Sequence, residues 1–376
     1  MYVNLFIVKI QKKGAKKCNK MKNKFIINGK IFTKKYISGV QRFTLEIIRE
    51  LDNIIDKDEI EICVPKCAKN IPNYKNLKIV KYSRLREIPW EQIAFPYYVA
   101  KNKGISINLG NVSPWINPGI VCIHDVNCIR NPKNFQKRMV IWYRFLFKRA
   151  MKKAIKIITV SDFCKREMLD CYNINENKIV VINNSWEHFS RIKVDDSIFS
   201  RYPQLKKEKF LFSIGTLTKH KNLEWVLKIA KENPKYYFAI SGFVNIQKFK
   251  NELDLESPPN VIYLGYLSDE QVKAIYKKTT ALLFPSLYEG FGLPPIEALS
   301  AGAKVVVADI ECMHEIFEDT VLYINPYQYN IDLDKLLNQE TARPEKILNK
   351  YSWRNSAQKL LNLIREEDNK IYEDNN

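Results

Sequence analysis

Short runs of hydrophobic residues alternate with amphipathic stretches through the first half of the chain. The runs predict strands at 25–28, 59–64, 77–80, 105–109, 120–124, 154–160 and 178–182. From Gly39 onward, apolar residues recur at roughly i, i+3 and i+4, which predicts a helix. Another helix is expected from Asp162 to about Leu169, because Ser161 is a favoured N-cap residue. Strands separated by helices predict a parallel sheet that is covered on both faces.

The second half repeats this alternation. Strands are expected at 210–215, 237–242, 261–264, 281–284 and 304–308. Helices are expected at 221–233, 268–277 and 294–299, and an amphipathic helix at 353–371 closes the chain. Ser268 and Gln271 form a capping-box pattern at the start of the second of these helices. The third should end near Gly302.

The pattern is interrupted near 191–209, where the residues are polar, include a proline and lack periodicity. We place a linker between two domains there. The expected order is an N-terminal extension at 1–23, a domain at 24–190, a linker at 191–208, a second domain at 209–345 and a final segment at 346–376. The expected fold class is α/β, with two doubly wound parallel-sheet domains.

Composition supports a globular protein. Of the 376 residues, 46% are hydrophobic and 27% are charged, which excludes a chain that is disordered throughout. No stretch approaches the roughly 18 consecutive apolar residues that a membrane span requires. The apolar run at 2–10 is short and its lysines follow it, so it makes a poor signal peptide. We therefore expect a cytoplasmic protein.

The cysteines do not form a recognisable metal or disulfide pattern. They are scattered at 18, 63, 67, 122, 128, 164, 171 and 312, and only Cys63 and Cys67 stand close together. Four histidines are present, and none lies beside that pair. We expect reduced, structural thiols, because a disulfide framework would be unusual in a chain of this length.

The charge balance is strongly basic, with 61 Lys and Arg against 41 Asp and Glu and a net charge of +20. The excess is mostly lysine spread along the chain, without a helix-turn-helix, RNP-type or zinc-finger signature, so we expect no nucleic-acid partner. Lysines concentrate at 9–24, after a short apolar patch. This segment could lie against an anionic membrane surface. It could equally be a solvated, disordered tail, or Met21 could be the true first residue.

The most specific stretch is F-P-S-L-Y-E-G-F-G-L-P-P-I-E-A-L at 284–299. A buried strand ends, a glycine-bearing loop turns, and a helix begins at two prolines, which suit a first helical turn. The loop would present backbone N–H groups at a helix N-terminus, which is an anion site. Glu289 stands in the loop and Glu297 in the first helical turn. Two carboxylates beside an anion site suit a ligand with phosphate in the middle and a sugar at each end. The alternative is a tight turn with an acid favoured by the helix dipole.

The spacing of Glu289 and Glu297 around G-F-G-L-P resembles the retaining group 1, family 4-like glycosyltransferases of GT-B fold. Further similarities are S-I-G-T-L-T-K-H-K-N-L at 213–223, G-Y-L-S at 265–268, S-G-V-Q-R-F at 38–43, W-E-Q at 90–92, H-D at 124–125 and V-S at 160–161. They span residues 24 to about 365. The resemblance implies two Rossmann-like domains facing across a cleft, the first on the acceptor side and the second binding the nucleotide sugar.

The resemblance also implies roles for individual residues. Glu297 would bind the donor ribose, and Glu289 with the loop Gly290, Phe291, Gly292 and Leu293 would hold the transferred sugar. Lys221 would neutralise the departing diphosphate, beside the turn at Gly215 and Thr216. Tyr266 and Leu267 would lie near the base. The residues expected to act in catalysis are Glu289, His124 and Lys221.

Two residues of the first domain complete the expected donor site. Gly39 would let the first loop approach the sugar–phosphate because it carries no Cβ, although it could be an ordinary turn glycine. His124 would face the cleft and bind the donor sugar or the acceptor, although a lone histidine is often structural.

The chain departs from the pattern of its relatives at the diphosphate turn. Many relatives carry arginine where Thr216 stands, and often another where His220 stands. The charge on the leaving group would then be met by Lys221, by Lys219 and by the helix that begins near Asn222. This departure puts the full strength of diphosphate binding in doubt.

The expected reaction moves a hexose or deoxyhexose, with retention, onto a growing bacterial surface glycan such as O-antigen or capsular polysaccharide. GDP-mannose is the first guess for the donor, and UDP- or dTDP-sugars are close behind. The acceptor would be a glycan or a lipid-linked oligosaccharide, so the enzyme could be peripheral on the inner face of the cytoplasmic membrane. The resemblance implies no cofactor and no bound metal. Alternatives are a nucleotide-sugar epimerase, a phosphorylase, or a non-catalytic protein that binds nucleotide or nucleic acid.

Three further segments allow two interpretations each. The basic, aromatic helix expected at 135–153 could touch a membrane, although half or more of it should be core. Trp90, Glu91 and Gln92 could shape the acceptor side, or Trp90 could be core. Glu187 and His188 could line the cleft or end a strand. The helix from Trp353 resembles one that packs back on the first domain.

Overall fold

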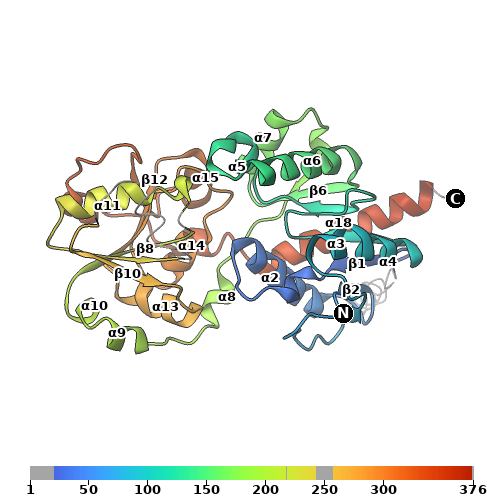
Figure 1. Ribbon diagram of the computed structural model, residues 1–376, viewed down its shortest axis with the longest axis horizontal. Coiled ribbons are helices and arrows are strands. Elements are labelled where there is room, and N and C mark those ends of the chain that lie inside the picture. Colours follow the sequence, from blue (N-terminus) through green and yellow to red (C-terminus); the bar gives the residue numbers. More distant parts are fainter. Residues whose placement is uncertain (1–20, 217, 243–256, 375–376) are drawn as a thin grey trace, which may run out of the picture.

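A computed structural model of the protein describes residues 21–216, 218–242 and 257–374. It contains two sheet units that lie side by side (Figure 1). Apart from residues 21–23, the basic extension expected at 1–23 lies outside the described residues, as does position 217 of the motif at 213–223.

The first unit is built on a seven-stranded parallel sheet of order β3-β2-β1-β4-β5-β6-β7 within the described residues. Its strands are β1 (Lys24–Asn28), β2 (Ile60–Val64), β3 (Lys78–Lys81), β4 (Gly104–Asn108), β5 (Ile120–Cys122), β6 (Lys156–Thr159) and β7 (Ile179–Val181). In register, Phe25 pairs with Ile60 on one side of β1 and with Ile105 on the other.

The second unit is built on a six-stranded parallel sheet, again counted over the described chain, of order β10-β9-β8-β11-β12-β13. Its strands are β8 (Phe210–Ile214), β9 (Tyr237–Ser241), β10 (Val261–Gly265), β11 (Ala281–Phe284), β12 (Val305–Ala308) and β13 (Leu322–Ile324). In both sheets the order of the parallel strands reverses beside the first strand, at β1/β4 and at β8/β11. Ligands of open α/β sheets bind at such switch points.

Helices cover both sheets. In the first unit they are α2 (Gly39–Ile54), α3 (Glu87–Pro89), α4 (Phe95–Lys101), α5 (Asn127–Arg130), α6 (Lys137–Lys153), α7 (Asp162–Cys171) and α8 (Glu187–Ser190), with a π-helical turn at Trp90–Ala94. In the second they are α9 (Ser197–Arg201), α10 (Gln204–Lys207), α11 (Leu223–Glu232), α13 (Asp269–Lys278), α14 (Leu293–Ser300), α15 (Glu311–Phe317), α16 (Leu333–Leu337) and α17 (Glu345–Leu348). The long helix α18 (Trp353–Asp374) follows.

The hydrophobic pattern explains why these residues form strands. Every residue of β2, β11 and β12 is buried, as expected for strands with helices on both faces. The two parallel sheets confirm the expected α/β class with two doubly wound units. The expected helix at Gly39 and the capping box of Ser268 and Gln271 are also present.

The segment at 191–209 is more regular than expected, because it contains the short helices α9 and α10. Ile198, Phe199 and Leu205 are buried there, so tertiary packing rather than periodicity holds these turns in place. The linker boundary at 191–208 stays a prediction.

The C-terminal helix α18 leaves the second unit and lies against α2 in the first, as the red helix in Figure 1 shows. Near its end, the Asp368 carboxylate accepts hydrogen bonds from the backbone N–H groups of Lys22 (2.7 Å) and Asn23 (2.8 Å). Arg365 pairs with Glu59 at 3.0 Å. The contacts of Asp368 fix the chain just before β1, an interior strand of the first sheet, and the Arg365 pair fixes it just before β2.

None of the described helices combines the length and the apolar character that a membrane crossing requires.

Candidate active site

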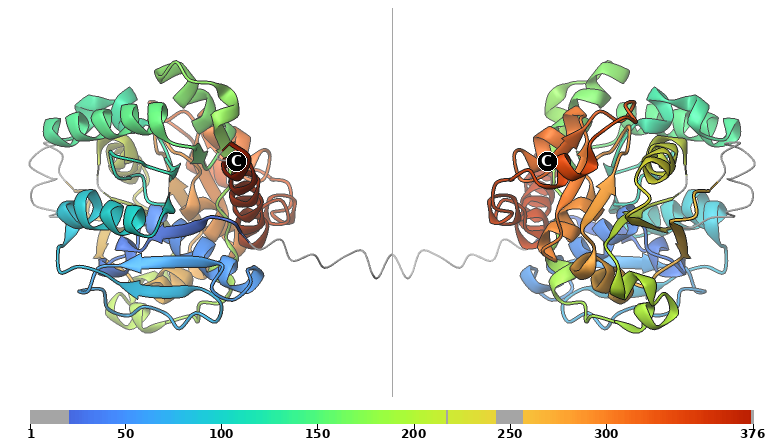
Figure 2. Two further views of the ribbon diagram at one scale, coloured as in Figure 1. Left: turned by 90° about the vertical axis from the view of Figure 1, so that its right-hand side faces the viewer. Right: turned by 90° about the vertical axis from the view of Figure 1, so that its left-hand side faces the viewer.

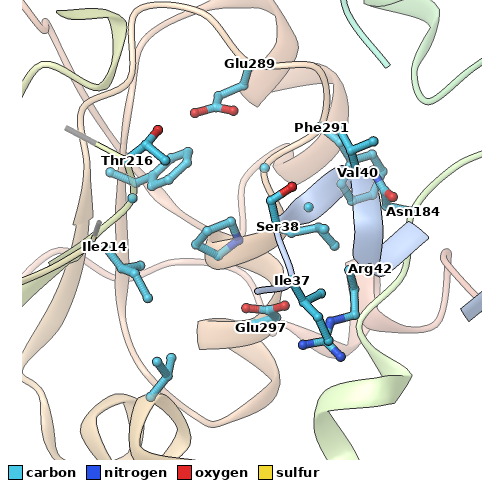
Figure 3. Close-up of a pocket in the computed structure, with 18 of the residues that line it drawn as sticks. Ile37, Ser38, Val40, Arg42, Asn184, Ile214, Thr216, Glu289, Phe291 and Glu297 are labelled. Atoms are coloured by element: carbon cyan, nitrogen blue, oxygen red, sulfur yellow. The ribbon is translucent and has the colours of Figure 1, made fainter. Parts of the chain in front are cut away.

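One pocket of about 360 Å³ lies where the two units meet, at the carboxyl ends of β8 and β11. Figure 3 shows part of its lining. Apart from Lys219, every residue expected to act in catalysis or to bind the donor lines it: Gly39, His124, Gly215, Thr216, Lys221, Tyr266, Leu267, Glu289, Gly290, Phe291, Gly292, Leu293 and Glu297. The structure therefore brings together residues from five separate segments, and their individual roles stay predictions.

The loop between β11 and α14 is held by the first unit. A Cβ on Gly290 would lie 2.5 Å from the carbonyl oxygen of His124, so only glycine permits this approach. The Ser161 hydroxyl donates to the Gly290 carbonyl at 2.7 Å. Gly292 has a φ of 97°, which turns the chain into α14. The first unit thus fixes this loop of the second unit across the cleft.

Gly39 begins α2 directly beside this loop. A Cβ built on it would lie 3.3 Å from Cδ1 of Leu293. The first unit's loop therefore reaches across to the second unit, where glycine leaves the most room.

Lys221 and Glu289 form an ion pair at one end of the pocket, where Lys221 Nζ donates to Glu289 Oε1. Lys221 ends a short 3-10 turn after β8, and Asn222 then adopts a left-handed φ of 54° and starts α11. Nδ2 of Asn222 donates to the Pro326 carbonyl at 2.8 Å, which fixes this bend. A cation is thus fixed beside the N-terminus of a helix, where an anion is favoured.

Glu297 stands at the other end. It is the fifth residue of α14, so it lies one turn into the helix and not in its first turn as expected. In the view of Figure 3 the Glu289 and Glu297 carboxylates lie apart, with Ser38 drawn between them. The Nε2 atom of His188 lies 2.9 Å from Glu297 Oε1.

His124 lines the pocket, but most of its ring is buried. Its Nε2 lies 3.0 Å from the carbonyl oxygen of Leu109, and the ring packs edge-on against Phe43. Burial lowers the pKa of His124 to about 4, although the bond to Leu109 opposes this. The imidazole is therefore neutral near pH 7 and is poorly suited to act as a general acid.

Asp125 is a pocket residue that the sequence analysis did not assign. Its carboxylate accepts from the backbone N–H of Asn127 at 2.8 Å. Burial raises the pKa of Asp125, and the nearby charge of Glu289 adds to this effect, whereas Lys221 lowers it. The position of Asp125 after His124, at the end of a predicted strand, was a signal that could have found it.

Two more features of the pocket were not predicted from the sequence, because they depend on contacts across the cleft. Arg42 of α2 pairs with Asp269 at the start of α13, and both line the pocket. Asn184 is 4% exposed and lines the pocket, and its Oδ1 has no hydrogen-bond partner among the residues that the structure describes. A buried polar atom without a partner in a pocket is available to a ligand.

His220 does not add a positive charge to the diphosphate end. Burial lowers the pKa of His220 to about 4, and the adjacent Lys221 lowers it further. Its ring stacks on Phe135 of the first unit, and neither His220 nor Lys219 lines the pocket. Among the described lining residues, the cations are Lys221 and Arg42.

Trp90 is a core residue. It is fully buried, stacks on Phe95 and donates to the Tyr82 carbonyl at 2.9 Å. Trp90, Glu91 and Gln92 are absent from the lining described for the pocket. Glu187 and His188 are tied to the start of α18, and His188 reaches the site through Glu297.

No group of three or more His, Cys, Asp or Glu within the described ranges is arranged to hold a metal ion.

Comparison with protein families agrees with this geometry. Residues 194–353 match the model of "Glycosyl transferases group 1". Residues 37–186 match that of "Glycosyltransferase Family 4". The chain belongs to the group 1 glycosyltransferases. The two matches cover most of both sheet units and all of the pocket lining except Phe189.

Two curated relatives and one solved structure are similar over most of the chain. The O-antigen chain mannosyltransferase RfbU of Salmonella typhimurium is 28% identical over 310 residues, which cover 77% of this chain and 83% of RfbU. An Escherichia coli UDP-Gal:alpha-D-GlcNAc-diphosphoundecaprenol alpha-1,3-galactosyltransferase is 25% identical over 363 residues, or 87% and 90% of the two chains. The structure of WaaG, a glycosyltransferase involved in lipopolysaccharide biosynthesis, has a TM-score of 0.59 at 15% identity and covers 89% of this chain and 93% of its own. This glycosyltransferase therefore has the GT-B fold that its sequence resembles.

Proposed function

We propose that this glycosyltransferase moves a hexose or deoxyhexose from a nucleoside diphosphate sugar onto a growing bacterial surface glycan, with retention of configuration. The single observation that carries the proposal is the pocket with a carboxylate at each end and a cation near one of them. Glu297 would accept hydrogen bonds from the ribose, and Glu289 from the transferred sugar. Lys221 and the N-terminus of α11 would face the diphosphate between them.

The proposed transfer needs no pair of acid and base residues. The bond between the sugar C1 and the diphosphate oxygen breaks, and the acceptor hydroxyl forms a new C1–O bond on the same face. Its proton passes to the departing diphosphate oxygen. The neutral imidazole of His124 fits this route, because no protonated side chain is required there.

GDP-mannose is the first donor to test. RfbU and other similar proteins are named O-antigen mannosyltransferases, which favours mannose and a surface-glycan acceptor. The galactosyltransferase of similar length is named for UDP-Gal, so a UDP-sugar is the next choice. Its acceptor carries a diphosphoundecaprenol lipid by name, which supports a lipid-linked acceptor for this chain.

A thermal-shift series with GDP, UDP and dTDP tests the donor site. We expect one nucleotide to raise the melting temperature of the wild type by several degrees, because a ligand at 100 times its Kd stabilises by about 2.7 kcal/mol. In Glu297→Gln this shift should largely disappear, since a neutral amide replaces the proposed ribose acceptor.

Glu224→Gln is the matched control. Glu224 pairs with Lys228 on the exposed face of α11, outside the pocket, so this variant should keep the full shift. If no nucleotide shifts the wild type, the proposed donor site is wrong. If Glu297→Gln keeps the shift, the nucleotide is bound but its ribose does not depend on Glu297.

We place the enzyme on the cytoplasmic membrane because one face of the first unit is both apolar and basic. Its exposed apolar residues include Ile93 and Tyr97 (both 61% exposed), Ile116 (59%), Ile141 (68%) and Phe145 (44%). In both views of Figure 2, α4 (cyan) and α6 (teal) lie toward the same edge of the molecule.

Contacts connect these residues into one surface. The side chain of Gln92 bonds the backbone of Ser113 and Trp115, each at 3.0 Å. Trp115 packs edge-on against Phe145, and the Arg149 guanidinium donates to the Trp115 carbonyl. Helix α6 also carries seven basic residues and no acid: Lys137, Arg138, Arg144, Lys148, Arg149, Lys152 and Lys153. Apolar side chains flanked by cations suit the interface of an anionic bilayer.

Vesicle co-sedimentation tests this face. We expect the wild type to bind phosphatidylglycerol vesicles more strongly than phosphatidylcholine vesicles, with binding that weakens as salt rises. Ile141→Ser combined with Phe145→Ser should lower the partition coefficient about tenfold, because two exposed apolar side chains no longer enter the interface. Tyr327→Ser is the control, since Tyr327 is 71% exposed on the second unit. Equal binding by the double variant would contradict the assignment.

A further inference from the structure

His188 connects the donor pocket to the start of the C-terminal helix. It is 3% exposed and lies in α8, at the point where the chain leaves the first unit. On one side its Nε2 contacts Glu297 Oε1 at 2.9 Å. On the other, the indole Nε1 of Trp353 lies 3.1 Å from its Nδ1. Trp353 is fully buried and begins α18.

These two contacts fix which nitrogen of His188 carries the proton. An indole N–H can only donate, so Nδ1 of His188 must accept from Trp353. The remaining proton then sits on Nε2, and Nε2–H donates to the Glu297 carboxylate. The hydrogen bonds thus run in one direction, from Trp353 through His188 to Glu297.

We infer that His188 is a positioning residue, which holds the Glu297 carboxylate in the orientation that receives the ribose hydroxyls. This inference rests on the proposed function of the pocket. A glutamate on a helix can adopt several rotamers, and a hydrogen bond to one oxygen selects among them. His188 bonds Oε1, which leaves Oε2 and the remaining lone pair of Oε1 to accept from the ligand. Trp353 keeps the donor on the correct side of the ring.

The neighbouring contacts give His188 little freedom to move. The Glu187 carboxylate accepts from the Ser352 hydroxyl at 3.0 Å and from the backbone N–H of Trp353. The Ser185 hydroxyl donates to the Tyr351 carbonyl at 2.9 Å. The segment at 185–188 and the segment at 351–353, which both run between the two units, are therefore joined directly behind Glu297.

The test measures Kd by calorimetry for GDP and UDP and for the 2′,3′-dideoxy form of each. For the nucleotide that binds the wild type, we expect His188→Phe to weaken binding about tenfold. This is roughly the effect of losing one hydrogen bond to a charged group. For the dideoxy form, His188→Phe should weaken binding less than about twofold, because this ligand lacks the ribose hydroxyls from which Glu297 accepts hydrogen bonds. In turnover assays, KM for the donor should rise while kcat stays nearly constant.

Companion variants separate positioning from general damage. Trp353→Phe keeps an aromatic ring but removes the indole N–H, so it should weaken the same ligand selectively. His188→Gln offers a carbonyl to Trp353 and an amide N–H to Glu297, and it should recover part of the affinity. In the Glu297→Gln background, His188→Phe should add no further loss. His314→Phe is the matched control, because His314 also contacts a carboxylate, Asp309 Oδ1 at 2.6 Å, but is exposed and outside the pocket.

The outcomes are distinguishable. Failure of the wild type to bind GDP or UDP here and dTDP in the thermal-shift series would overturn the proposed function itself. If the wild type and Glu297→Gln behave as expected while His188→Phe and Trp353→Phe bind like the wild type, only the positioning role is overturned. Equal losses for the ribose and dideoxy ligands would also overturn it, since that pattern indicates a general structural defect.

Discussion

The Lys221→Met variant should lose at least about tenfold in kcat, which corresponds to about 1.4 kcal/mol of transition-state stabilisation. Methionine keeps a long apolar side chain but removes the charge. Among the described lining residues the other cation, Arg42, is paired with Asp269. His220 is neutral near pH 7 because burial lowers its pKa to about 4. The negative charge that develops on the leaving diphosphate would then have no cation to meet it.

The measurement is the release of nucleoside diphosphate from GDP-mannose, or from the donor that the thermal-shift series selects. Lys228→Met is the control, because Lys228 forms a comparable ion pair with Glu224 on the surface of α11. It should retain wild-type turnover. A folded Lys221→Met enzyme with unchanged kcat would remove Lys221 from the proposed mechanism.

The uncharged residue Thr216 makes the predicted effect of Lys221→Met larger. The family resemblance led us to expect arginine at that position, and the threonine there lines the pocket without adding charge. An enzyme with two cations at the diphosphate can lose one and retain part of its activity. In this chain the described pocket lining holds no second cation near Lys221, so kcat should depend unusually strongly on Lys221.

The strand, loop and helix at 281–300 could be predicted closely from the sequence, because each boundary has a local cause. Burial on both faces gives β11 a continuous apolar run, and the glycines and prolines then fix the turn and the first turn of α14. The same holds for α2, whose period and capping residue, Ser38, lie within one short stretch.

Other features depend on contacts between distant residues and have no local signal. Glu297 and His188 are 109 positions apart, and their contact exists only because the chain crosses between the units beside α14. Arg42 and Asp269 meet for the same reason. Helices α9 and α10 are too short to show a helical period, and buried side chains such as Phe199 and Leu205 hold them in place. The sequence therefore predicted which segments meet at the site, but not how they are bonded to each other.

The Glu289→Gln variant should also lower kcat at least about tenfold, but for a different reason, and it should leave nucleoside diphosphate binding almost intact. In the structure, the Glu289 carboxylate is bonded to Lys221 and the Glu289 side chain is 13% exposed. When the donor binds, we expect Lys221 to turn to the diphosphate and Glu289 to the sugar hydroxyls. Glutamine has one acceptor oxygen and no charge, so it would hold both the sugar and the lysine less well.

Two measurements separate this effect from that of Glu297→Gln. Glu289→Gln should keep the thermal shift with nucleoside diphosphate alone, whereas Glu297→Gln should lose it, because of these two carboxylates only that of Glu297 is expected to contact the nucleotide. Glu289→Gln should bind the intact nucleotide sugar no more tightly than it binds the nucleoside diphosphate, since the contribution of the sugar to affinity depends on the Glu289 carboxylate. Glu224→Gln, the exposed partner of Lys228, should behave as wild type in both. Wild-type turnover by a folded Glu289→Gln enzyme would show that the transferred sugar is held elsewhere, and Asp125, with its pKa raised by burial beside Glu289, would be the next residue to change.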